Sequence, residues 1–180
     1  MNRFALSTLI AAGLAVAAPN ARAQTSMLSG FQIGAAGGVA FPTGDLGDIS
    51  NTGYNVSVMV GVKPALLPVG VRLEAAYNQF GLEGVDGNVN IPSFTGNLTF
   101  ALPMAGFSPY AIGGAGLYRT NVDQTGVESE GKNRFGFNVG GGIKIPLSTS
   151  FETFVEARYN RVNTDNGNLS FVPITVGIMF

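Results

Sequence analysis

The sequence predicts an all-β protein, an eight-stranded antiparallel transmembrane β-barrel with up-and-down connections, preceded by a cleavable signal peptide. Three observations predict it. Eight segments alternate apolar and other residues with a period of two, which is typical of strands with one apolar face. Aromatic residues gather at both ends of these apolar faces. After residue 23, no apolar run approaches the ~20 residues that a membrane-spanning helix needs.

Residues 1–23 have the pattern of a secretory signal peptide. The basic residue Arg3 precedes an apolar run from Phe4 to Ala18, and small residues occupy the cleavage positions in Ala21-Arg22-Ala23. The alternative is a membrane-spanning helix, but a run of about 14 residues is too short to cross a bilayer. We therefore expect cleavage after Ala23 and a single barrel domain over residues 24–180.

Turn residues separate the eight predicted strands. The first apolar face ends at Phe41, before the turn-rich segment that begins with Pro42, and Pro64 and Pro68 bracket the next short turn. The eighth strand alternates strictly from Val172 to Phe180. In chain order, the apolar faces run over 31–41, 54–62, 69–77, 94–102, 110–118, 135–145, 151–159 and 172–180. Nine residues at ~3.3 Å each, tilted by about 40°, rise roughly 23 Å, close to the ~25 Å apolar band of membrane barrels.

Aromatic side chains fall into two belts when the strands alternate in direction. The upper belt contains Phe41, Tyr54, Tyr77, Phe94, Tyr118, Phe135 and Tyr159, and the lower belt contains Phe31, Phe100, Tyr110, Phe151 and Phe180. Two belts that flank an apolar band are typical of membrane barrels. The alternative is a soluble, lipocalin-like barrel with the apolar faces inside, but a soluble core gives rings no reason to separate into belts. We therefore expect the apolar faces to contact lipid.

The opposite face of the strands carries the charges and is expected to line the interior. Arg72, Glu74, Glu156 and Arg158 lie at mid-height on strands that are four apart in the ring, and therefore on facing walls. Buried charges must pair, so we expect Glu74 near Arg158 and Glu156 near Arg72. The alternative, if barrel shear offsets the heights, is pairing of the two charges within each strand. In either case one network fills the narrow interior. Three further charges are expected at the lower mouth of the barrel: Lys63, Lys144 and Glu152.

Composition limits the chemistry of the interior. The chain has 180 residues, 12% of them charged, with no cysteine and no histidine. Thiol chemistry, metal binding through thiolate or imidazole, and the usual general base of serine enzymes are therefore excluded. Glu74 and Glu156 offer an alternative as a catalytic carboxylate pair, but the ion network is the favoured interpretation. We expect no enzymatic activity, cofactor or metal site, and the net charge of −1 offers no basic surface for nucleic acid.

Several segments resemble the outer-membrane β-barrel domain family, and in particular its small eight-stranded members of the outer-membrane protein A and X type. The resemblance covers roughly residues 24–180. It rests on Gly34 to Gly38, on Pro109-Tyr110 with the glycines after it, on Phe135 to Gly142 and on Pro173 to Phe180. It implies a monomer surrounded by outer-membrane lipids, exported by its signal peptide. It also implies that the outer-membrane assembly machinery reads Phe180 as its signal.

The connections predict an orientation and a role. Short turns at 64–68, 103–109 and 146–150 alternate with longer connections at 42–53, 78–93, 119–134 and 160–171. This asymmetry predicts periplasmic turns and external loops. Members of the family are structural, adhesive or weakly permeable, so we expect a structural or surface-interaction role through the loops, with an unidentified loop partner. The alternative is a narrow porin-like channel or a carrier for small solutes.

The first long loop is acidic and rich in turn residues. Asp45, Asp48 and Asn51 supply oxygen atoms of the kind that bind Ca²⁺, but their spacing is not that of a known calcium loop. Side chains of this type also stabilise turns by bonding to their own backbone. We expect the turn role here.

Overall fold

The computed structural model describes residues 30–63, 68–84, 86–124, 127–128, 131–148, 151–164 and 167–180. The predicted signal peptide at residues 1–23 lies outside these described residues. Four of the residues predicted in the first short turn, 64–67, lie outside them as well.

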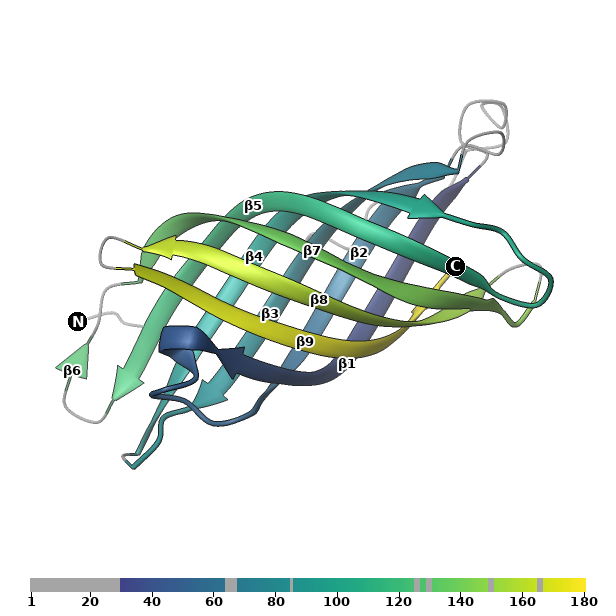
Figure 1. The fold of residues 1–180 in the computed structure, drawn as a ribbon. Helices are drawn as coiled ribbons and strands as arrows, with labels where there is room; N and C mark the ends of the chain where they lie inside the picture. Colours follow the sequence, from purple (N-terminus) through teal and green to yellow (C-terminus); the bar gives the residue numbers. More distant parts are fainter. Residues whose placement is uncertain are drawn as a thin grey trace, which may run out of the picture.

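Eight strands wrap into a closed antiparallel barrel in which all strands tilt the same way (Figure 1). They are β1 (Phe31–Thr43), β2 (Gly53–Val62), β3 (Val69–Gly81), β4 (Gly87–Ala101), β5 (Ser108–Gln124), β7 (Lys132–Pro146), β8 (Glu152–Thr164) and β9 (Gly167–Met179). A two-residue strand, β6 (Val127–Glu128), pairs only with the end of β5. The order is β4-β3-β2-β1-β9-β8-β7-β5, and pairing of β4 with β5 closes the ring. The predicted eight-stranded up-and-down barrel is confirmed.

The first and last strands meet at a continuous seam. β1 and β9 pair from Gly34 with Met179 to Thr43 with Ser170. Beyond the end of β9, the Ile33 amide donates to the Phe180 carbonyl at 3.0 Å, and the Phe180 amide donates to the Ile33 carbonyl at 2.8 Å. The barrel end that holds Phe31 and Phe180 is called the terminal rim below, and the opposite end is called the loop rim.

A short 3-10 turn follows β1 at the loop rim. This turn, η1 (Gly44–Leu46), is the only helical element in the described part of the chain. No helix there is long and apolar enough to cross a membrane.

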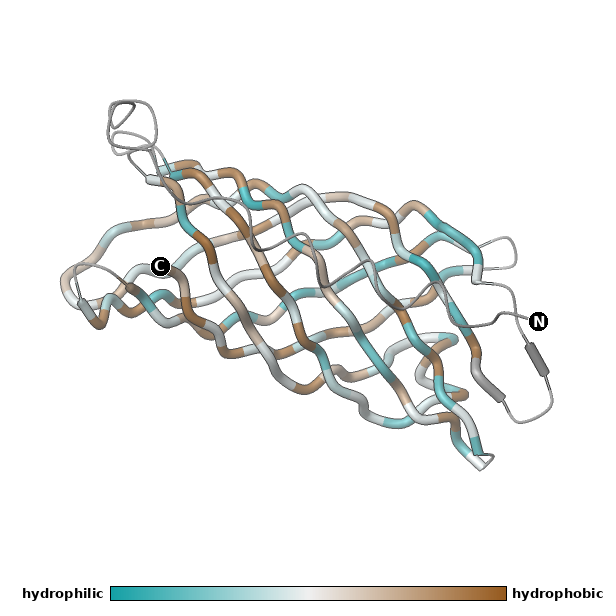
Figure 2. The backbone as a smooth tube through the Cα atoms, turned by 180° about the vertical axis from the view of Figure 1, so that it is seen from behind, coloured by the Kyte–Doolittle hydropathy of each residue, from teal (hydrophilic) through white to brown (hydrophobic). Residues whose placement is uncertain are grey.

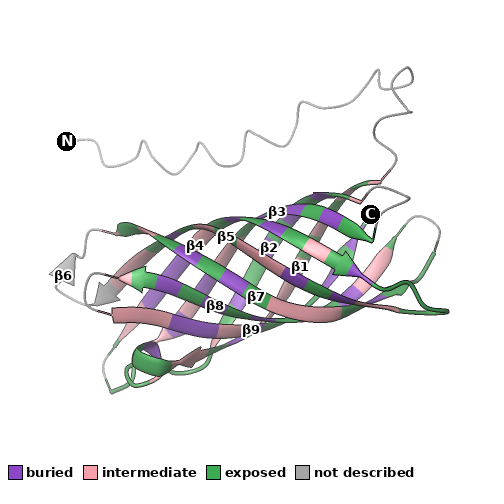
Figure 3. Cartoon of the chain, turned by 45° about the horizontal axis from the view of Figure 1, so that its top comes forward, coloured by how far each residue is buried: buried purple, intermediate pink, exposed green. Residues whose placement is uncertain are grey.

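Apolar side chains face outward and polar side chains face inward along most of the barrel wall. In β2, Val56 and Val58 are 49% and 58% exposed, whereas Asn55 and Ser57, which alternate with them, are buried. The same alternation of exposed and buried residues, and of hydrophobic and hydrophilic ones, repeats around the barrel (Figures 2 and 3). A band of exposed apolar side chains that runs around the whole barrel is typical of a wall that contacts lipid rather than water.

The predicted face of the fifth strand is wrong. Tyr110 and Tyr118 were expected in the aromatic belts, but both are buried in the interior, while Ala111 and Leu117 point outward. The other predicted belt residues lie on the outward face: Phe31, Phe41, Tyr54, Tyr77, Phe94, Phe100, Phe135, Phe151, Tyr159 and Phe180.

Glycines in the neighbouring strand explain the inward rings of β5. A Cβ atom on Gly142 would lie 2.9 Å from the Tyr110 ring, and one on Gly136 would lie 2.8 Å from the Tyr118 ring. The missing side chains therefore leave the space that the two rings occupy. Small residues dominate both faces of β5, so the period-two pattern of its sequence does not distinguish the faces.

The strands at the loop rim are longer than predicted. Residues 78–93 and 160–171 were expected to be loops, but β3 continues to Gly81, β4 starts at Gly87, β8 continues to Thr164 and β9 starts at Gly167. Most of 119–134 is strand as well. The extra length has a physical reason, because buried apolar residues such as Phe80 and Ile91 continue the inward face beyond the belt.

Candidate functional site

Four charged side chains meet in the middle of the barrel from opposite walls. Arg72 and Glu74 point inward from β3, and Glu156 and Arg158 point inward from β8. Arg72 pairs with Glu156 and Arg158 pairs with Glu74 across the interior. Within β8, the Arg158 Nε lies 2.7 Å from Glu156 Oε1, and within β3 the Arg72 Nε lies 3.8 Å from Glu74 Oε2. Each carboxylate therefore lies between two arginines.

The four side chains, called the central ion network below, are almost completely shielded from solvent. Their exposed fractions are between 2% and 6%. Tyr110 donates to Glu156 Oε2 at 2.6 Å, and the Arg72 guanidinium carbon lies 5.7 Å from the centre of the Phe154 ring. Desolvated charges are stable only when each has partners of opposite charge, and here two arginines and two glutamates balance one another and link β3 to β8 across the barrel.

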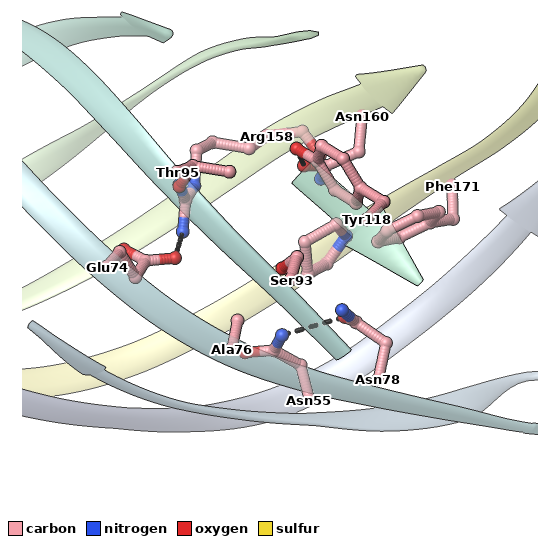
Figure 4. A pocket seen from close by; sticks show the side chains of 11 residues that line it. Asn55, Glu74, Ala76, Asn78, Ser93, Thr95, Tyr118, Arg158, Asn160 and Phe171 are labelled. Atoms are coloured by element: carbon pink, nitrogen blue, oxygen red, sulfur yellow. Dashed lines mark hydrogen bonds and ion pairs between the residues drawn. The ribbon is translucent and has the colours of Figure 1, made fainter. Parts of the chain in front are cut away.

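A layer of amides lies next to the ion network on the side of the loop rim. Asn55 donates to Asn78 at 2.7 Å, and Tyr118 donates to Asn160 at 3.0 Å. These residues, with Glu74 and Arg158, line a cavity of about 10 Å³ (Figure 4). A cavity of this size holds about one water molecule. The gap between the amides and the ion network is therefore too small for a solute.

Beyond the amides, apolar side chains close the loop rim. Leu46 from η1 and Phe80 from β3 are fully buried, and the Phe80 ring packs edge-on against Phe171 at 5.5 Å between centroids. The complete cluster, called the loop-rim cluster, consists of Ala40, Leu46, Phe80, Val89, Ile91, Tyr118, Val162 and Phe171. This cluster fills the barrel interior at the loop rim with apolar side chains. A water-filled pore would need polar side chains and open space at the same place.

A second apolar cluster fills the interior toward the terminal rim. It consists of Met59, Ala101, Tyr110, Ile112, Phe154 and Met179. Of the charges predicted at this mouth, Lys144 pairs with Glu152 at 2.6 Å and lies 5.6 Å from the Tyr110 ring centre. Lys63, partly exposed, joins neither this pair nor the central ion network among the described side chains. The interior thus has three layers, apolar, ionic with amides, and apolar.

Sequence reasoning missed both apolar clusters. It assigned the whole inward face to polar groups and did not consider Phe80, Phe154 or Phe171 as interior residues. The sequence pattern could have placed these rings inside the barrel. Counted in steps of two along its strand, each ring falls on the face opposite to the lipid-facing residues. The acidic segment that was weighed as a calcium loop forms η1, where the Gly47 amide donates to the Gly44 carbonyl at 2.7 Å. Among the described residues, no group of three acidic side chains is placed to hold a metal ion.

Replacing Leu46 by alanine is expected to lower the free energy of unfolding by about 2 kcal/mol. The side chain is fully buried in the loop-rim cluster, and a truncated leucine leaves a cavity. We place the effect at the lower end of the range because η1 can move to fill part of the space. Denaturant unfolding in detergent micelles measures it, with exposed Ile49→Ala as the control. Equal stability of both variants would show that Leu46 does not close the rim.

The described loops at this rim form an ordered surface rather than separate tips. The Asn51 amide donates to the Gly81 carbonyl at 2.8 Å, and the Glu83 amide donates to the Ile49 carbonyl at 3.0 Å. The first loop is thereby fixed to the β3–β4 hairpin. Asp45, Asp48, Ile49, Glu83 and Asp86 are exposed on it. This acidic surface around one apolar side chain is called the loop-rim surface.

Comparison with known families agrees with this geometry. A family model described as "Outer membrane protein beta-barrel domain" matches residues 7–180. The chain belongs to this family. Membership places the exposed apolar band in a bacterial outer membrane, as the resemblance implied. No curated protein sequence matches the chain.

Solved structures show the same fold at low sequence identity. Neisserial surface protein A (NspA) superimposes with a TM-score of 0.71 at 19% identity, covering 84% of this chain and 96% of the other. The N-terminal β-barrel domain of Pseudomonas aeruginosa OprF gives 0.53 at 16%, covering 83% and 96%. The outer membrane enzyme PagL gives 0.51 at 14%, covering 83% and 98%. The same fold therefore occurs in a surface protein and in an enzyme, so the fold alone does not decide the function of this chain.

Proposed function

We propose that this outer-membrane barrel is a non-catalytic structural or surface-interaction protein that acts through its loop-rim surface. The observation that carries the proposal is the three-layered filling of the interior. Two apolar clusters and the central ion network fill the interior at three levels, and the cavity beside the network holds about one water molecule. In this proposal the loop rim faces outward and the terminal rim faces the periplasm.

The absence of catalysis is supported by the state of the carboxylates. Among the residues that the structure describes, Glu74 and Glu156 are the only interior acids at mid-height, and each pairs with two arginines. A general acid or base needs a reacting group within hydrogen-bond reach, but both side chains are buried and three of their four oxygens already contact arginine nitrogens within hydrogen-bond distance. The sequence supplies no histidine or cysteine as a replacement.

A comparison of two proteins in lipid nanodiscs tests the loop role. The wild type and a variant with Asp45→Asn, Asp48→Asn and Glu83→Gln are used to capture proteins from envelope extracts and from serum. We expect the wild type to retain basic partners that the neutral variant loses, because the loop-rim surface is acidic. Identical captured sets would contradict the role of these residues. Current steps across planar bilayers with the wild type would instead favour the narrow channel.

We also propose that Phe180 contributes to assembly. Its ring is 55% exposed at the terminal rim and lies 6.0 Å from the Phe151 ring, beside the seam that closes the barrel. Phe180→Ala keeps the two backbone hydrogen bonds to Ile33 but removes the ring. We expect several-fold slower insertion in a reconstituted assembly reaction, with Phe151→Ala less affected. Equal rates for Phe180→Ala and the wild type would remove Phe180 as the assembly signal.

A further inference from the structure

The outward face of the barrel carries two charges among the strand side chains that the structure describes. They are Arg119 on β5 and Arg161 on β8, and both are exposed. Arg119 points outward because the face of β5 is the reverse of the one predicted. These two strands flank β7, so both charges lie on the same wall of the barrel.

Strand register brings the two arginines to either side of one aromatic residue. Across β7, Arg119 pairs with Asn133 and Arg161 pairs with Phe137. The outward residue midway between these partners is Phe135, which is 59% exposed. Neighbouring strands are ~4.8 Å apart, so β5 and β8 are separated by about 10 Å, and the four residues from Asn133 to Phe137 add an offset of about 13 Å along the strands. Two long cationic side chains therefore frame an exposed ring at the upper edge of the apolar band.

Neither guanidinium is neutralised within the described structure. The Arg119 Nε donates to the Asn121 side-chain oxygen at 3.3 Å, and no described acidic side chain pairs with Arg119 or Arg161. On the side of the terminal rim, the same wall is apolar: Leu117 and Val139 are 58% and 56% exposed. The two guanidinium groups thus lie next to an apolar strip of the barrel wall. This arrangement is complementary to a lipid that has an anionic headgroup and acyl chains.

We propose that Arg119 and Arg161 bind the phosphate groups of a phosphorylated lipid of the surrounding membrane, whose acyl chains lie along β5 and β7. Guanidinium groups bind phosphate through paired hydrogen bonds, and their geometry favours Arg over Lys at such sites. Basic residues at a membrane surface attract anionic headgroups. The site depends on the membrane placement of the barrel and not on the proposed role of the loops.

Binding of diphosphorylated lipid A to the purified protein in detergent micelles, followed by native mass spectrometry, tests the site. One basic residue near the headgroups favours binding about fivefold, so R119Q/R161Q is expected to bind roughly 25-fold more weakly than the wild type. K63Q removes a charge at the opposite rim and is expected to bind like the wild type. Dephosphorylated lipid A is expected to bind all three proteins equally.

Three outcomes would overturn the proposal. They are equal binding of diphosphorylated lipid A by R119Q/R161Q and the wild type, an equal loss in K63Q, and binding of inorganic phosphate alone as tightly as the lipid. Unchanged heat-modifiable migration in gels shows that each variant is folded. If R119Q/R161Q does not fold, R119K/R161K replaces it, and a several-fold loss with retained charge supports the same geometry.

Discussion

Glu74→Ala is expected to lower the free energy of unfolding by about 3–5 kcal/mol. Glu74 is 3% exposed and pairs with Arg158 across the barrel. Its removal leaves Arg72 and Arg158 to share Glu156, so positive charge remains buried without sufficient compensation. Breaking a buried ion pair by removing one partner has a cost of this size. Reversible denaturant unfolding in detergent micelles measures the change.

Two further variants show whether the effect of Glu74→Ala comes from the central ion network or from the loss of any one charged side chain. Glu152→Ala leaves Lys144, 9% exposed, without its carboxylate, but Glu152 is 20% exposed at the terminal rim and water can replace it, so a smaller loss of about 1–2 kcal/mol is expected. Adding Arg158→Ala to Glu74→Ala removes the stranded cation and should restore part of the stability. If Glu74→Ala is no more destabilising than Glu152→Ala, the central ion network does not hold the two walls together.

Val58→Arg is expected to prevent stable insertion, with a cost of about 2–4 kcal/mol for the folded barrel. Val58 is 58% exposed in the middle of β2, and an arginine at the midplane must remain in the hydrocarbon. Folding into lipid vesicles, followed by heat-modifiable gel migration, measures the inserted fraction.

The matched control places the same residue at the edge of the apolar band. Asn163 on β8 is exposed and follows Arg161 on the outward face near the loop rim. Asn163→Arg should cost no more than about 1 kcal/mol, because an arginine near the interface reaches water. Equal insertion of both variants would mean that β2 does not face lipid.

The sequence predicted the barrel because, in the strands other than β5, large apolar side chains recur at every second position over most of the outward face. In β2 or β9 the alternation of valine or isoleucine with small or polar residues permits one orientation in lipid. β5 differs, since it has small side chains on both faces. Ala111, Gly113 and Ala115 lie on its outward face, and the inward face also contains glycines. Packing against β7 glycines, and the hydroxyl partners of Tyr110 and Tyr118, decide the orientation there.

The sequence also predicted one part of the candidate site and not the rest. Spacing along the strands placed Glu74, Arg72, Glu156 and Arg158 at similar heights, and the structure brings them together. Alternation alone does not reveal the apolar clusters. Where an inward Phe154 stands next to an outward Val155, both faces of the strand are apolar, and the pattern does not show which residue is inside. Arg119 and Arg161 were missed because their alignment depends on register across β7, which the sequence does not show.

The accessibility of spin labels tests most directly the central claim, a lipid-facing wall around a filled interior. The chain has no cysteine, so single cysteines at Ala115 and Val58 on the outward face, and at Ile112 and Ser57 on the inward face, can each be labelled in vesicles. We expect high oxygen accessibility at Ala115 and Val58. At Ile112 and Ser57 we expect protection from both oxygen and a water-soluble nickel reagent. Nickel accessibility at the inward sites, or oxygen accessibility at Ile112 rather than Ala115, would contradict the structure described here.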